Sequence, residues 1–593
     1  MTARNYDLAV AIGGEAGQGI ATPGDILARI FVRRGLHLNA YNAYQSIIRG
    51  GHIFLTVRVS DEECPTHGDK LDILLCLNQD TMDRHLHLMG PGSKVIYNSD
   101  TIEPGKAAEG VGLCPIPVSE LSESRNRLIQ NTIAVGVMSA LVGLEFETLE
   151  DSLSLRFQRQ GEKIVSENVG VARAGYDYAK ANFETFPDLL PTGEKPLGVW
   201  AGNDAVAMGA AAAGVKFYAA YPMSPSSGIL HWMAQNARNL GIMVRQVEDE
   251  IGVANMVIGA AHTGVRAMCG TSGGGFALMT EAVGAAGMME IPVVYVDVQR
   301  AGPSTGVPTK TEQGDLWQIL GASQGDYERF VVAPKDALDA FNTMPELFNL
   351  CDKAQCPGLV LIDLLIGEGR FSFDPDDVDM HPSIDRGELI TEGTLSGETY
   401  QRYKDTDSGI SPRAIAGLEG YVHVVATDEH DEDGILISDE FTNPHKRRQM
   451  VEKRARKFQN VIDDVAPPEL EGEKNADVTL IGWGSTYGVI KEAIAQLADQ
   501  GVTVNHLPVK WIIPLHGDAI VDILSSSKKT IIIENNYSGQ FARYLRSETG
   551  FAPDGHIRKY DGEPFMPHHI VDGVLEQIAG KTNHYVPYQE VIV

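Results

Sequence analysis

The sequence has few cysteines and no tight cysteine pair. Of its 593 residues six are cysteine, none in a CxxC pattern, and the closest two, Cys351 and Cys356, are separated by four residues. Iron–sulfur clusters and structural zinc normally need at least one tight pair. The spacing argues against a metal or cluster held by this chain and predicts reduced thiols buried as small hydrophobic side chains. The other cysteines are Cys64, Cys76, Cys114 and Cys269.

Positive charge and long apolar runs are also scarce. The chain has 49 Lys and Arg against 79 Asp and Glu, a formal net charge of −30. Such a charge repels phosphate backbones, which argues against nucleic-acid binding as the main function. No apolar run approaches the roughly twenty residues that cross a bilayer, and the beginning, MTARNYDLAVAIGG, lacks the pattern of a signal peptide. The sequence therefore predicts a cytoplasmic protein without a membrane span.

The first block, residues 1–190, has an α/β pattern. An alternating strand, YDLAVAI, leads into the glycine loop GGEAGQG at 13–19 and then into an amphipathic stretch. This arrangement can direct backbone amides at an anion or a nucleotide-like ligand, but its GxxGxG spacing is not the dinucleotide fingerprint. A ligand site and a structural turn are equally open. The block ends in a proline-bearing linker at 187–196, where we expect cleavage to release it folded. Further strands are expected at 54–60 and 72–77, and a helix at 125–142.

The second block, residues 196–370, alternates short apolar strands with helices rich in small residues, the pattern of a doubly wound parallel sheet. Four consecutive strand ends carry polar or glycine-rich loops. They are PMSPSS at 222–227, EDE at 248–250, TSGGG at 271–275 and QRAGPSTGVPTKTEQGD at 299–315. Because ligands bind outside the carboxyl ends of such strands, this clustering predicts the functional site.

Two of these loops carry residues suited to acid–base or anion chemistry. Glu248, Asp249 and Glu250 crowd a strand-to-helix junction, where carboxylates gain from the helix dipole. Glu250 opens an apolar helix, so we expect it to be partly buried, with a raised pKa suited to proton transfer. Arg300 ends a buried strand and needs an anion, which a substrate carboxylate or one of these acids can provide.

Ser224 lies between Pro222 and Pro225, which stiffen the backbone on both sides. Ser226 or Ser227 is then placed to N-cap the following helix. A capped turn accounts for the serines about as well as a binding role does. It does not explain a hydroxyl held between two prolines at a strand end.

The rest of the chain consists of an irregular segment and a smaller doubly wound domain. Residues 371–470 have little apolar periodicity and contain a basic helix at 445–457 with seven Lys or Arg. We expect this helix to present a solvated or interface face, with docking of an acidic electron carrier or a CoA phosphate as the alternative. Residues 471–593 restart the α/β pattern. Since 593 residues exceed one core, we predict an α/β protein of three α/β domains.

Motifs from nearly the whole chain point to one family. After the first block they are YPMSPSS (221–227), QVEDE (246–250), TSGGGFALMTEA (271–282), QRAGPSTGVPTKTEQGDL (299–316), GNDAVAMGAAAAG (202–214), SGISPRAIAG (408–417), GWGST and ENNYSGQ. These closely resemble the alpha subunit of 2-oxoacid:ferredoxin oxidoreductases. GGEAGQG and IIRGGH in the first block resemble the gamma subunit, fused in front. The fused gamma–alpha order is most similar to 2-oxoglutarate:ferredoxin oxidoreductase.

The resemblance implies the type of each domain. Residues 1–190 resemble the gamma domain and 196–370 a thiamine pyrimidine-binding domain. Residues 371–470 connect it to a transketolase C-terminal-like domain at 471–593.

It also implies a thiamine diphosphate enzyme. A 2-oxoacid is decarboxylated on the thiazolium, electrons pass through iron–sulfur clusters to ferredoxin, and CoA accepts the acyl group. For 2-oxoglutarate the products are succinyl-CoA and CO2, the 2-oxoglutarate synthase activity. In the reverse direction reduced ferredoxin drives carboxylation, the CO2 fixation of a reverse tricarboxylic acid cycle.

Two motifs of such enzymes are missing from this chain. The GDG…Asn motif that holds diphosphate and Mg²⁺ is absent, and so is a cluster-binding CxxC. The resemblance assigns both, with the [4Fe-4S] cluster, to a separate beta subunit of roughly 300 residues. It implies a dimer of alpha–beta heterodimers, in which this chain supplies the facing half of each active site.

The resemblance gives roles to single residues. Glu250 matches the glutamate that bonds the aminopyrimidine of thiamine and promotes its imino tautomer. Arg300 matches the arginine that grips the substrate carboxylate. Ser224 stands where the family has Thr, beside the cofactor with Pro222. The resemblance implies that its hydroxyl still bonds the substrate carboxylate, while the lost methyl widens the pocket. Gly228 replaces an acidic residue, and TSGGG replaces the more common TSGPG.

Three alternatives stay open. The same chemistry can act on pyruvate or on a branched or aryl 2-oxoacid, and a second cation for a distal carboxylate would discriminate, with Arg49, His52 and Lys310 as candidates. A non-catalytic CoA-binding or scaffold subunit is another, against which the presence of both Glu250 and Arg300 argues. A transketolase-like dehydrogenase would share the fold but would not explain the gamma-like block.

Overall fold

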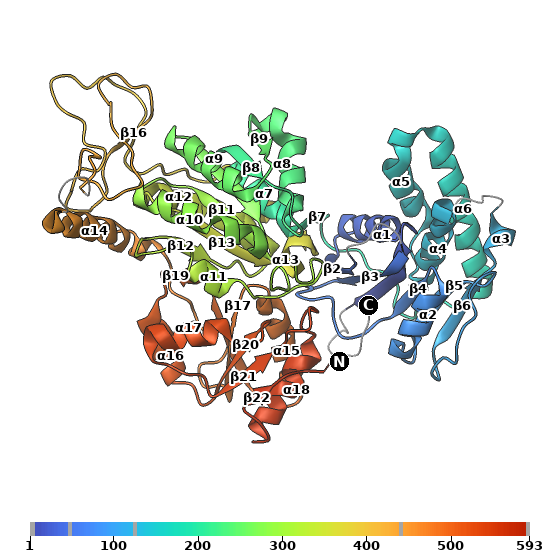
Figure 1. Cartoon of the computed structure of the whole chain (residues 1–593). Helices are drawn as coiled ribbons and strands as arrows, with labels where there is room; N and C mark the ends of the chain where they lie inside the picture. Colours follow the sequence, from blue (N-terminus) through green and yellow to red (C-terminus); the bar gives the residue numbers. More distant parts are fainter. Residues whose placement is uncertain (1–5, 46–49, 123–126, 438–442, 589–593) are drawn as a thin grey trace. The chain divides into compact units, whose positions relative to one another are not determined.

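The computed structural model describes residues 6–45, 50–122, 127–437 and 443–588, to which all structural statements refer. The chain folds into two compact units (Figure 1). Unit 1 contains the described residues up to Ala201, then 369–377 and Tyr588. Unit 2 contains residues 202–368 and 378–587. The chain therefore leaves unit 1, returns to it for nine residues, and leaves it again.

Unit 1 is built on a mixed sheet that has eight strands within the described residues, in the order β6-β5-β4-β1-β3-β2-β14-β7. The pairs β1–β4, β4–β5 and β5–β6 are parallel, and the other neighbours are antiparallel. The strands predicted at 54–60 and 72–77 are confirmed as β3 and β4. The bounds are β1 (Asp7–Ala16), β2 (His37–Ala43), β3 (Gly50–Ser60), β4 (Ile73–Cys76), β5 (Lys94–Asn98), β6 (Gly112–Ile116), β7 (Gly198–Ala201) and β14 (Arg370–Phe373).

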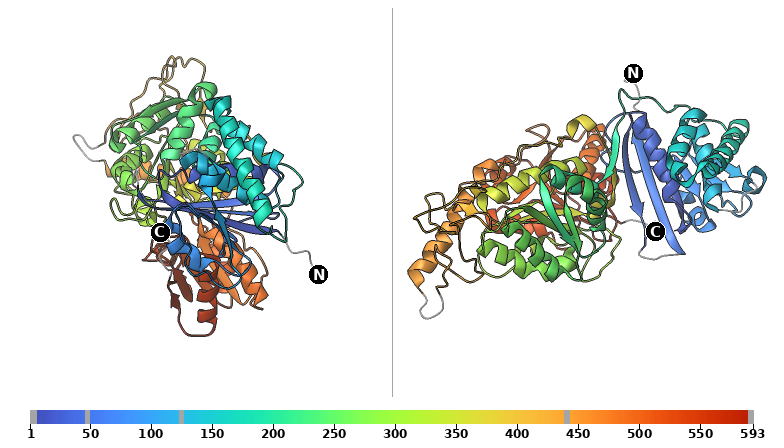
Figure 2. Two further views of the ribbon diagram at one scale, coloured as in Figure 1. Left: turned by 90° about the vertical axis from the view of Figure 1, so that its right-hand side faces the viewer. Right: turned by 90° about the horizontal axis from the view of Figure 1, so that it is seen from above.

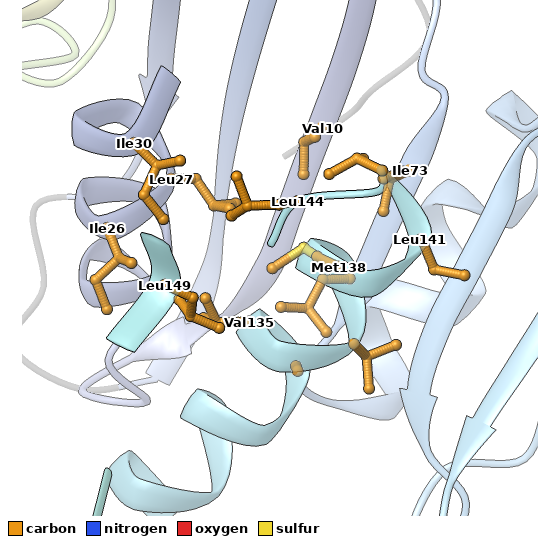
Figure 3. Packing of buried hydrophobic residues seen from close by; sticks show 14 of the residues in the cluster. Val10, Ile26, Leu27, Ile30, Ile73, Val135, Met138, Leu141, Leu144 and Leu149 are labelled. Atoms are coloured by element: carbon orange, nitrogen blue, oxygen red, sulfur yellow. The ribbon is translucent and has the colours of Figure 1, made fainter. Parts of the chain in front are cut away.

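Helices cover the apolar side chains of this sheet. Leu8, Val10 and Ile12, at alternate positions of β1, share one buried cluster with residues of α1, α4 and α5. Figure 3 shows Val10 among members of this cluster. Figure 2 shows these helices and strands from two further directions. The helix predicted at 125–142 is confirmed as α4. The bounds are α1 (Ala21–Arg33), α2 (Gln79–His85), α3 (Val118–Leu121), α4 (Arg127–Leu141), α5 (Phe146–Phe157) and α6 (Glu162–Asn182).

The segment predicted as a linker, 187–196, is bound to unit 1. The amides of Gly193 and Leu197 donate to the carbonyls of Arg34 and Val32 at 2.8 and 2.7 Å. The Nε of Arg34 donates to the carbonyl of Pro191 at 2.8 Å. Beyond it, β7 pairs with β14, and β14 pairs with β2. Unit 1 therefore continues past the linker to Ala201 and takes one strand from much later in the sequence.

Unit 2 contains the parallel sheet predicted for the second block. The strand order is β19-β12-β13-β11-β10-β8-β9, in which only the edge strand β19 of the described residues runs antiparallel to its neighbour. The doubly wound parallel sheet is confirmed. The bounds are β8 (Val215–Ala220), β9 (Met243–Gln246), β10 (Arg266–Thr271), β11 (Val294–Gln299), β12 (Phe330–Val332), β13 (Gly358–Asp363) and β19 (Trp511–Ile513).

Two sets of helices sandwich this sheet. Side chains of α7, α8 and α12 form one buried cluster with one face of the strands. Side chains of α9 and α10 form a second cluster with the other face and with the C-terminal domain. The bounds are α7 (Gly202–Ala212), α8 (Ser227–Leu240), α9 (Glu250–His262), α10 (Gly273–Met288), α11 (Leu316–Leu320), α12 (Ala337–Ala354) and α13 (Leu364–Glu368).

The C-terminal domain is a parallel sheet of order β18-β17-β20-β21-β22 with its own helices. Its strands are β17 (Val478–Trp483), β18 (Val504–Val509), β20 (Thr530–Glu534), β21 (Gly555–Arg558) and β22 (His584–Tyr585). Its helices are α15 (Thr486–Asp499), α16 (Gly517–Ser525), α17 (Gln540–Thr549) and α18 (Pro567–Ile578).

The segment before this domain has little regular structure. It contains the short strands β15 (Leu389–Ile390) and β16 (Arg413–Ala414) and the helix α14 (Pro444–Gln459). No helix among the described residues is long and apolar enough to cross a bilayer. All six cysteines are free thiols, and all but the partly exposed Cys64 are buried, as predicted.

The basic helix α14 presents the expected solvated face with only part of its cations: Arg447 and Arg448 are exposed, whereas three other cations are buried. Lys453 and Lys457 are fully buried and both bond the buried carboxylate of Glu290, at 2.9 and 3.2 Å. Arg454 forms a two-pronged ion pair with Glu429 at 2.9 and 2.8 Å. These cations are neutralised inside unit 2, so they are not free to dock an acidic carrier or a CoA phosphate.

Candidate active site

The predicted loops meet at one edge of the parallel sheet of unit 2. Strands β8, β9, β10 and β11 are parallel, so their carboxyl ends point the same way. Ser224 follows β8, Glu250 follows β9 and Arg300 follows β11. Thr271, the last residue of β10, lies in register with Asp297 of β11. The fold thus brings the sequence-predicted residues to the edge where doubly wound sheets bind ligands.

Glu250 is the buried member of the acidic triplet. Its neighbour Asp249 is the N-cap of α9 and accepts a hydrogen bond from the amide of Gly252 at 2.7 Å, the role expected of a carboxylate at a helix start. Glu248 is exposed, whereas Glu250 is 4% exposed. The described residues give the Glu250 carboxylate no hydrogen-bond or ion-pair partner. A buried carboxylate in that state is suited to receive a polar group of a ligand.

Gly275 makes room for this carboxylate. A Cβ atom at Gly275 would overlap the hydroxyl of Thr271 and lie 2.7 Å from Oε1 of Glu250. Gly274, in the position where the resembling motif has proline, is exposed, and a Cβ there would lie 3.7 Å from the nearest atom, the carbonyl oxygen of Ser304. The third glycine of TSGGG is therefore required by packing around Glu250, and the second is not.

Arg300 is held by the backbone beside Ser224. Its Nη1 donates to the carbonyl of Ser224 at 2.8 Å, while its Nε is buried without a partner among the described residues. Burial lowers the pKa of Arg300, and the Asp315 carboxylate opposes that shift. One N–H donor of the Arg300 guanidinium is engaged and another has no partner among the described residues, which suits the side chain to bind an incoming anion.

The hydroxyl groups of the PMSPSS loop have hydrogen-bond partners other than those that we expected. Ser224 and Pro222 are exposed at the strand end, and it is the carbonyl of Ser224 that contacts Arg300. Ser226 occupies the N-cap position of α8, but its hydroxyl donates backwards to the carbonyl of Met223 at 2.8 Å. The predicted side-chain cap by Ser226 or Ser227 is therefore wrong, because the tight turn offers a closer acceptor.

Gly228 permits close packing of α8 on α7. A Cβ at Gly228 would lie 2.8 Å from the Cβ of Asn203, whose amide donates to the carbonyl of Pro225 at 2.8 Å. An acidic side chain, usual at this position in the resembling motif, would displace Asn203. Gly228 therefore leaves room for Asn203, whose amide bonds the loop before α8.

Comparison with known proteins gives the same order of domains. Family profiles match residues 9–178 (pyruvate ferredoxin/flavodoxin oxidoreductase), 208–453 (its thiamine diphosphate-binding domain) and 469–584 (transketolase, C-terminal domain). The alpha subunit of 2-oxoacid:ferredoxin oxidoreductase 2 from Aeropyrum pernix is 32% identical over 96% of this chain and 97% of its own. The chain belongs to the 2-oxoacid:ferredoxin oxidoreductase family, as an alpha subunit. The predicted α/β fold class and the gamma–alpha fusion are confirmed.

Other relatives bear on the substrate. The 2-oxoglutarate oxidoreductase subunit KorA of Mycobacterium tuberculosis is 29% identical over 98% of this chain and 92% of its own. The solved structure of 2-oxoglutarate:ferredoxin oxidoreductase from Magnetococcus marinus, with 2-oxoglutarate, coenzyme A and succinyl-CoA bound, is 33% identical, with a TM-score of 0.89 over 97% of this chain and 100% of that chain.

Two buried aspartates of the alpha subunit, one in β11 and one at the end of the loop after it, were not predicted from the sequence. Asp297 is 1% exposed within β11, and Asp315 lies at the end of the loop that follows this strand. Burial and Asp315 raise the pKa of Asp297 well above its usual range. Burial raises the pKa of Asp315 to about 6, against the opposing effects of Asp297 and Arg300. An aspartate interrupting the apolar run VVYVDV was the signal available in the sequence.

The candidate cations for a distal substrate carboxylate already have protein partners. Lys310 forms an ion pair with Glu563 in unit 2. His52 is buried in unit 1, with its Nε2 2.7 Å from that of His85 and its Nδ1 3.2 Å from Asp80. Arg49 lies outside the described residues.

The glycine loop of unit 1 borders a cavity of about 320 Å³. Gly13 and Gly14 belong to β1, and Gly17 and Gly19 have the left-handed φ of a tight turn. The cavity is lined by the ends of β1, β4, β5 and β6, by residues that follow these strands and by α4, with Glu15 as the charged residue of the lining. The loop therefore forms both a turn and part of the cavity wall. The lining of the cavity, as the described residues form it, includes no cation that could bind an anionic ligand.

Proposed function

We propose that this alpha subunit supplies half of the active site of a 2-oxoglutarate:ferredoxin oxidoreductase. The reaction is 2-oxoglutarate plus CoA plus two oxidised ferredoxins giving succinyl-CoA, CO2, two reduced ferredoxins and a proton. The observation that carries the proposal is the likeness, at 33% identity over 97% of this chain, to a structure that contains 2-oxoglutarate and succinyl-CoA. The site is also suited to an anionic substrate, because the buried Nε of Arg300 has no hydrogen-bond partner among the described residues.

Thiamine diphosphate fits the residues at the sheet edge. Glu250 offers a buried carboxylate without a protein partner among the described residues, in a space that Gly275 keeps open. When bound, the cofactor supplies the carbanion chemistry of decarboxylation. We propose that the Glu250 carboxylate shares a proton with the far nitrogen of the aminopyrimidine ring, and that Pro222 and Ser224 border the same ring.

Arg300 is proposed to bind the carboxylate of the 2-oxoacid. A guanidinium can hold a carboxylate through two parallel N–H···O bonds. Nη1 is engaged by the Ser224 carbonyl, which fixes the plane of the fork, and the Ser224 hydroxyl at the exposed strand end is placed to donate to the same substrate group.

The remaining parts are assigned to other subunits. The described residues contain no cluster of three or more side chains able to hold a metal ion. We therefore propose that a beta subunit holds Mg²⁺, the cofactor diphosphate and a [4Fe-4S] cluster, that the complex is a dimer of alpha–beta heterodimers, and that ferredoxin and CoA bind this complex. Free thiols throughout the chain support a location in the cytoplasm.

Co-purification with the beta subunit tests the proposal. We expect CoA-dependent reduction of ferredoxin with 2-oxoglutarate, and a kcat/KM for pyruvate or a branched 2-oxoacid at least about tenfold lower, the scale of one lost charge contact. The alpha subunit alone should be colourless and inactive. A preference for pyruvate would change the substrate and keep the chemistry. Inactivity of the complex toward every 2-oxoacid would identify a non-catalytic subunit.

A further inference from the structure

Thr271, the last residue of β10, places a buried hydroxyl beside Glu250. Thr271 is 1% exposed. A Cβ atom at Gly275 would overlap this hydroxyl and would also lie 2.7 Å from Oε1 of Glu250. The two oxygens therefore border the same small space, which exists because residue 275 is glycine. One oxygen is held by the sheet and the other by the first residue of α9.

The Thr271 hydroxyl has only weak acceptors in this structure. Its Oγ1 lies 3.9 Å from Sδ of Met223 and 3.4 Å from the carbonyl oxygen of Ser272. A thioether sulfur is a weak acceptor. The Ser272 carbonyl already accepts the amides of Gly275 and Phe276 at 2.8 and 2.9 Å, which occupies both of its lone pairs. The hydroxyl is therefore buried without a strong acceptor, a state that costs free energy.

The Glu250 carboxylate has the opposite deficiency. It is 4% exposed and accepts no hydrogen bond from any described residue. A carboxylate has about four lone-pair positions on its two oxygens, so one bond to a ligand leaves others to be satisfied. A hydroxyl that donates to a carboxylate forms a charge-assisted bond, roughly twice as strong as a bond between neutral groups. A donor that lacks a strong acceptor thus lies next to an acceptor that lacks a donor.

Asp297 is the other buried carboxyl group beside Thr271. It lies in register with Thr271 on β11, is 1% exposed, and neither of its oxygens has a hydrogen-bond partner among the described residues. Burial and Asp315 raise its pKa well above the usual range, so it is neutral and a weaker acceptor than a carboxylate. Glu250 lies in the first turn of α9, where the helix dipole favours its anion. Glu250 is therefore the stronger acceptor for the hydroxyl.

We propose that Thr271 is a positioning residue whose hydroxyl donates to the Glu250 carboxylate once thiamine diphosphate is bound, and so fixes the oxygen that faces the aminopyrimidine ring. The proposal rests on the proposed function, since it takes Glu250 as the group that bonds the cofactor. Threonine side chains occupy discrete staggered rotamers, so a bond from Thr271 restricts the carboxylate to one orientation. Only hydrogen bonds change in this step, and the threonine keeps its proton.

Binding of thiamine diphosphate with Mg²⁺ to the complex with the beta subunit tests this role without turnover. Thr271→Val keeps the shape of the side chain and removes the hydroxyl, so the Kd measured by calorimetry should rise about tenfold, the scale of one charge-assisted hydrogen bond. Thr271→Ser keeps the hydroxyl and should bind within about twofold of the wild type. In a Glu250→Gln background, Thr271→Val should change the Kd by at most about twofold, because the charged acceptor is already lost.

Thr343→Val is the matched control. Thr343 is a fully buried residue of α12, and its hydroxyl has no partner among the described residues. Buried side chains of α12 pack on the face of the sheet opposite to α9 and α10. The same substitution there should leave the Kd unchanged. Thr271→Ala repeats the measurement if Thr271→Val fails to assemble.

A Kd of Thr271→Val equal to that of the wild type would overturn the proposal. An equal loss in the wild-type and Glu250→Gln backgrounds would assign the effect to another contact, such as Asp297, and overturn it as well. A complex that binds the cofactor but turns over no 2-oxoacid would refute the proposed function alone, and the Kd values would still decide the role of Thr271. A complex that does not bind thiamine diphosphate would refute both.

Discussion

Gly275 determines where the Glu250 carboxylate can lie. A methyl group there would overlap Thr271 and press on Oε1 of Glu250, so Gly275→Ala should displace the carboxylate. Because alanine favours a helix over glycine, the helix itself should not suffer. We expect turnover of the complex to fall about tenfold or more, as small misplacements of reacting groups do. Gly274→Ala is the control, and equal turnover of the two variants would show that Glu250 has no such constraint.

The same scale shows what the sequence could predict of the site. An acidic triplet before an apolar helix predicted a buried Glu250, and the end of a buried strand predicted Arg300; both positions follow from local pattern. The hydroxyl of Ser226 was misjudged because its acceptor, the Met223 carbonyl, exists only in the folded turn. Asp297 and Asp315 influence each other electrostatically across an intervening loop, which no spacing rule describes.

At the scale of secondary-structure elements, helix α14 contributes strongly to the stability of the fold. Glu290 is the buried anion of Lys453 and Lys457, and its loss leaves two buried cations unpaired. Glu290→Gln should lower the free energy of unfolding by about 3–5 kcal/mol, the cost of breaking a buried pair. Glu452→Gln, which removes the partner of the exposed Arg448, should cost at most about 1 kcal/mol. Similar costs in denaturant titrations would contradict this account of the helix.

The ion pairs of Glu290 also predict how the stability of the protein changes as the pH falls. Burial by itself raises the pKa of Glu290, but Lys453, Lys457 and Arg402 outweigh it and hold that pKa well below its usual range. A lowered folded-state pKa means that this contribution to stability is present above about pH 4.5 and is lost as the pH falls below it. Below that pH, the stability difference between wild type and Glu290→Gln should shrink.

The sequence could not predict this use of α14. Seven cations in thirteen residues are typical of a solvated face. The partners of the buried cations lie outside the helix, Glu290 after α10 and Glu429 in the irregular segment. That segment has no periodic pattern, so the sequence could not place it.

At the scale of the whole molecule, β14 changes the expected result of proteolysis. Cleavage within 191–196 leaves Arg370 and Phe371 of β14, in the second fragment, paired with β2 of the first. The predicted release of a free first block should therefore not occur. After a cut at an inserted protease site, the two fragments should co-elute in size-exclusion chromatography. Separate elution without denaturant would show that β14 does not hold unit 1 together. The strand at 370–373 is short and has no predicted strand beside it in the sequence, so its pairing with β2 was not predicted.

Thiazolium proton exchange tests the central claim most directly, namely that Glu250 of this alpha subunit activates the cofactor. In the complex with its beta subunit, Glu250→Gln keeps size and shape and removes the exchangeable proton. We expect deuterium exchange at the thiazolium carbon to slow by roughly 10²-fold or more, on the scale of general acid–base catalysis. Glu248→Gln, at the exposed position, should exchange at the wild-type rate. Unchanged exchange in Glu250→Gln, or slow exchange in Glu248→Gln instead, would contradict the account.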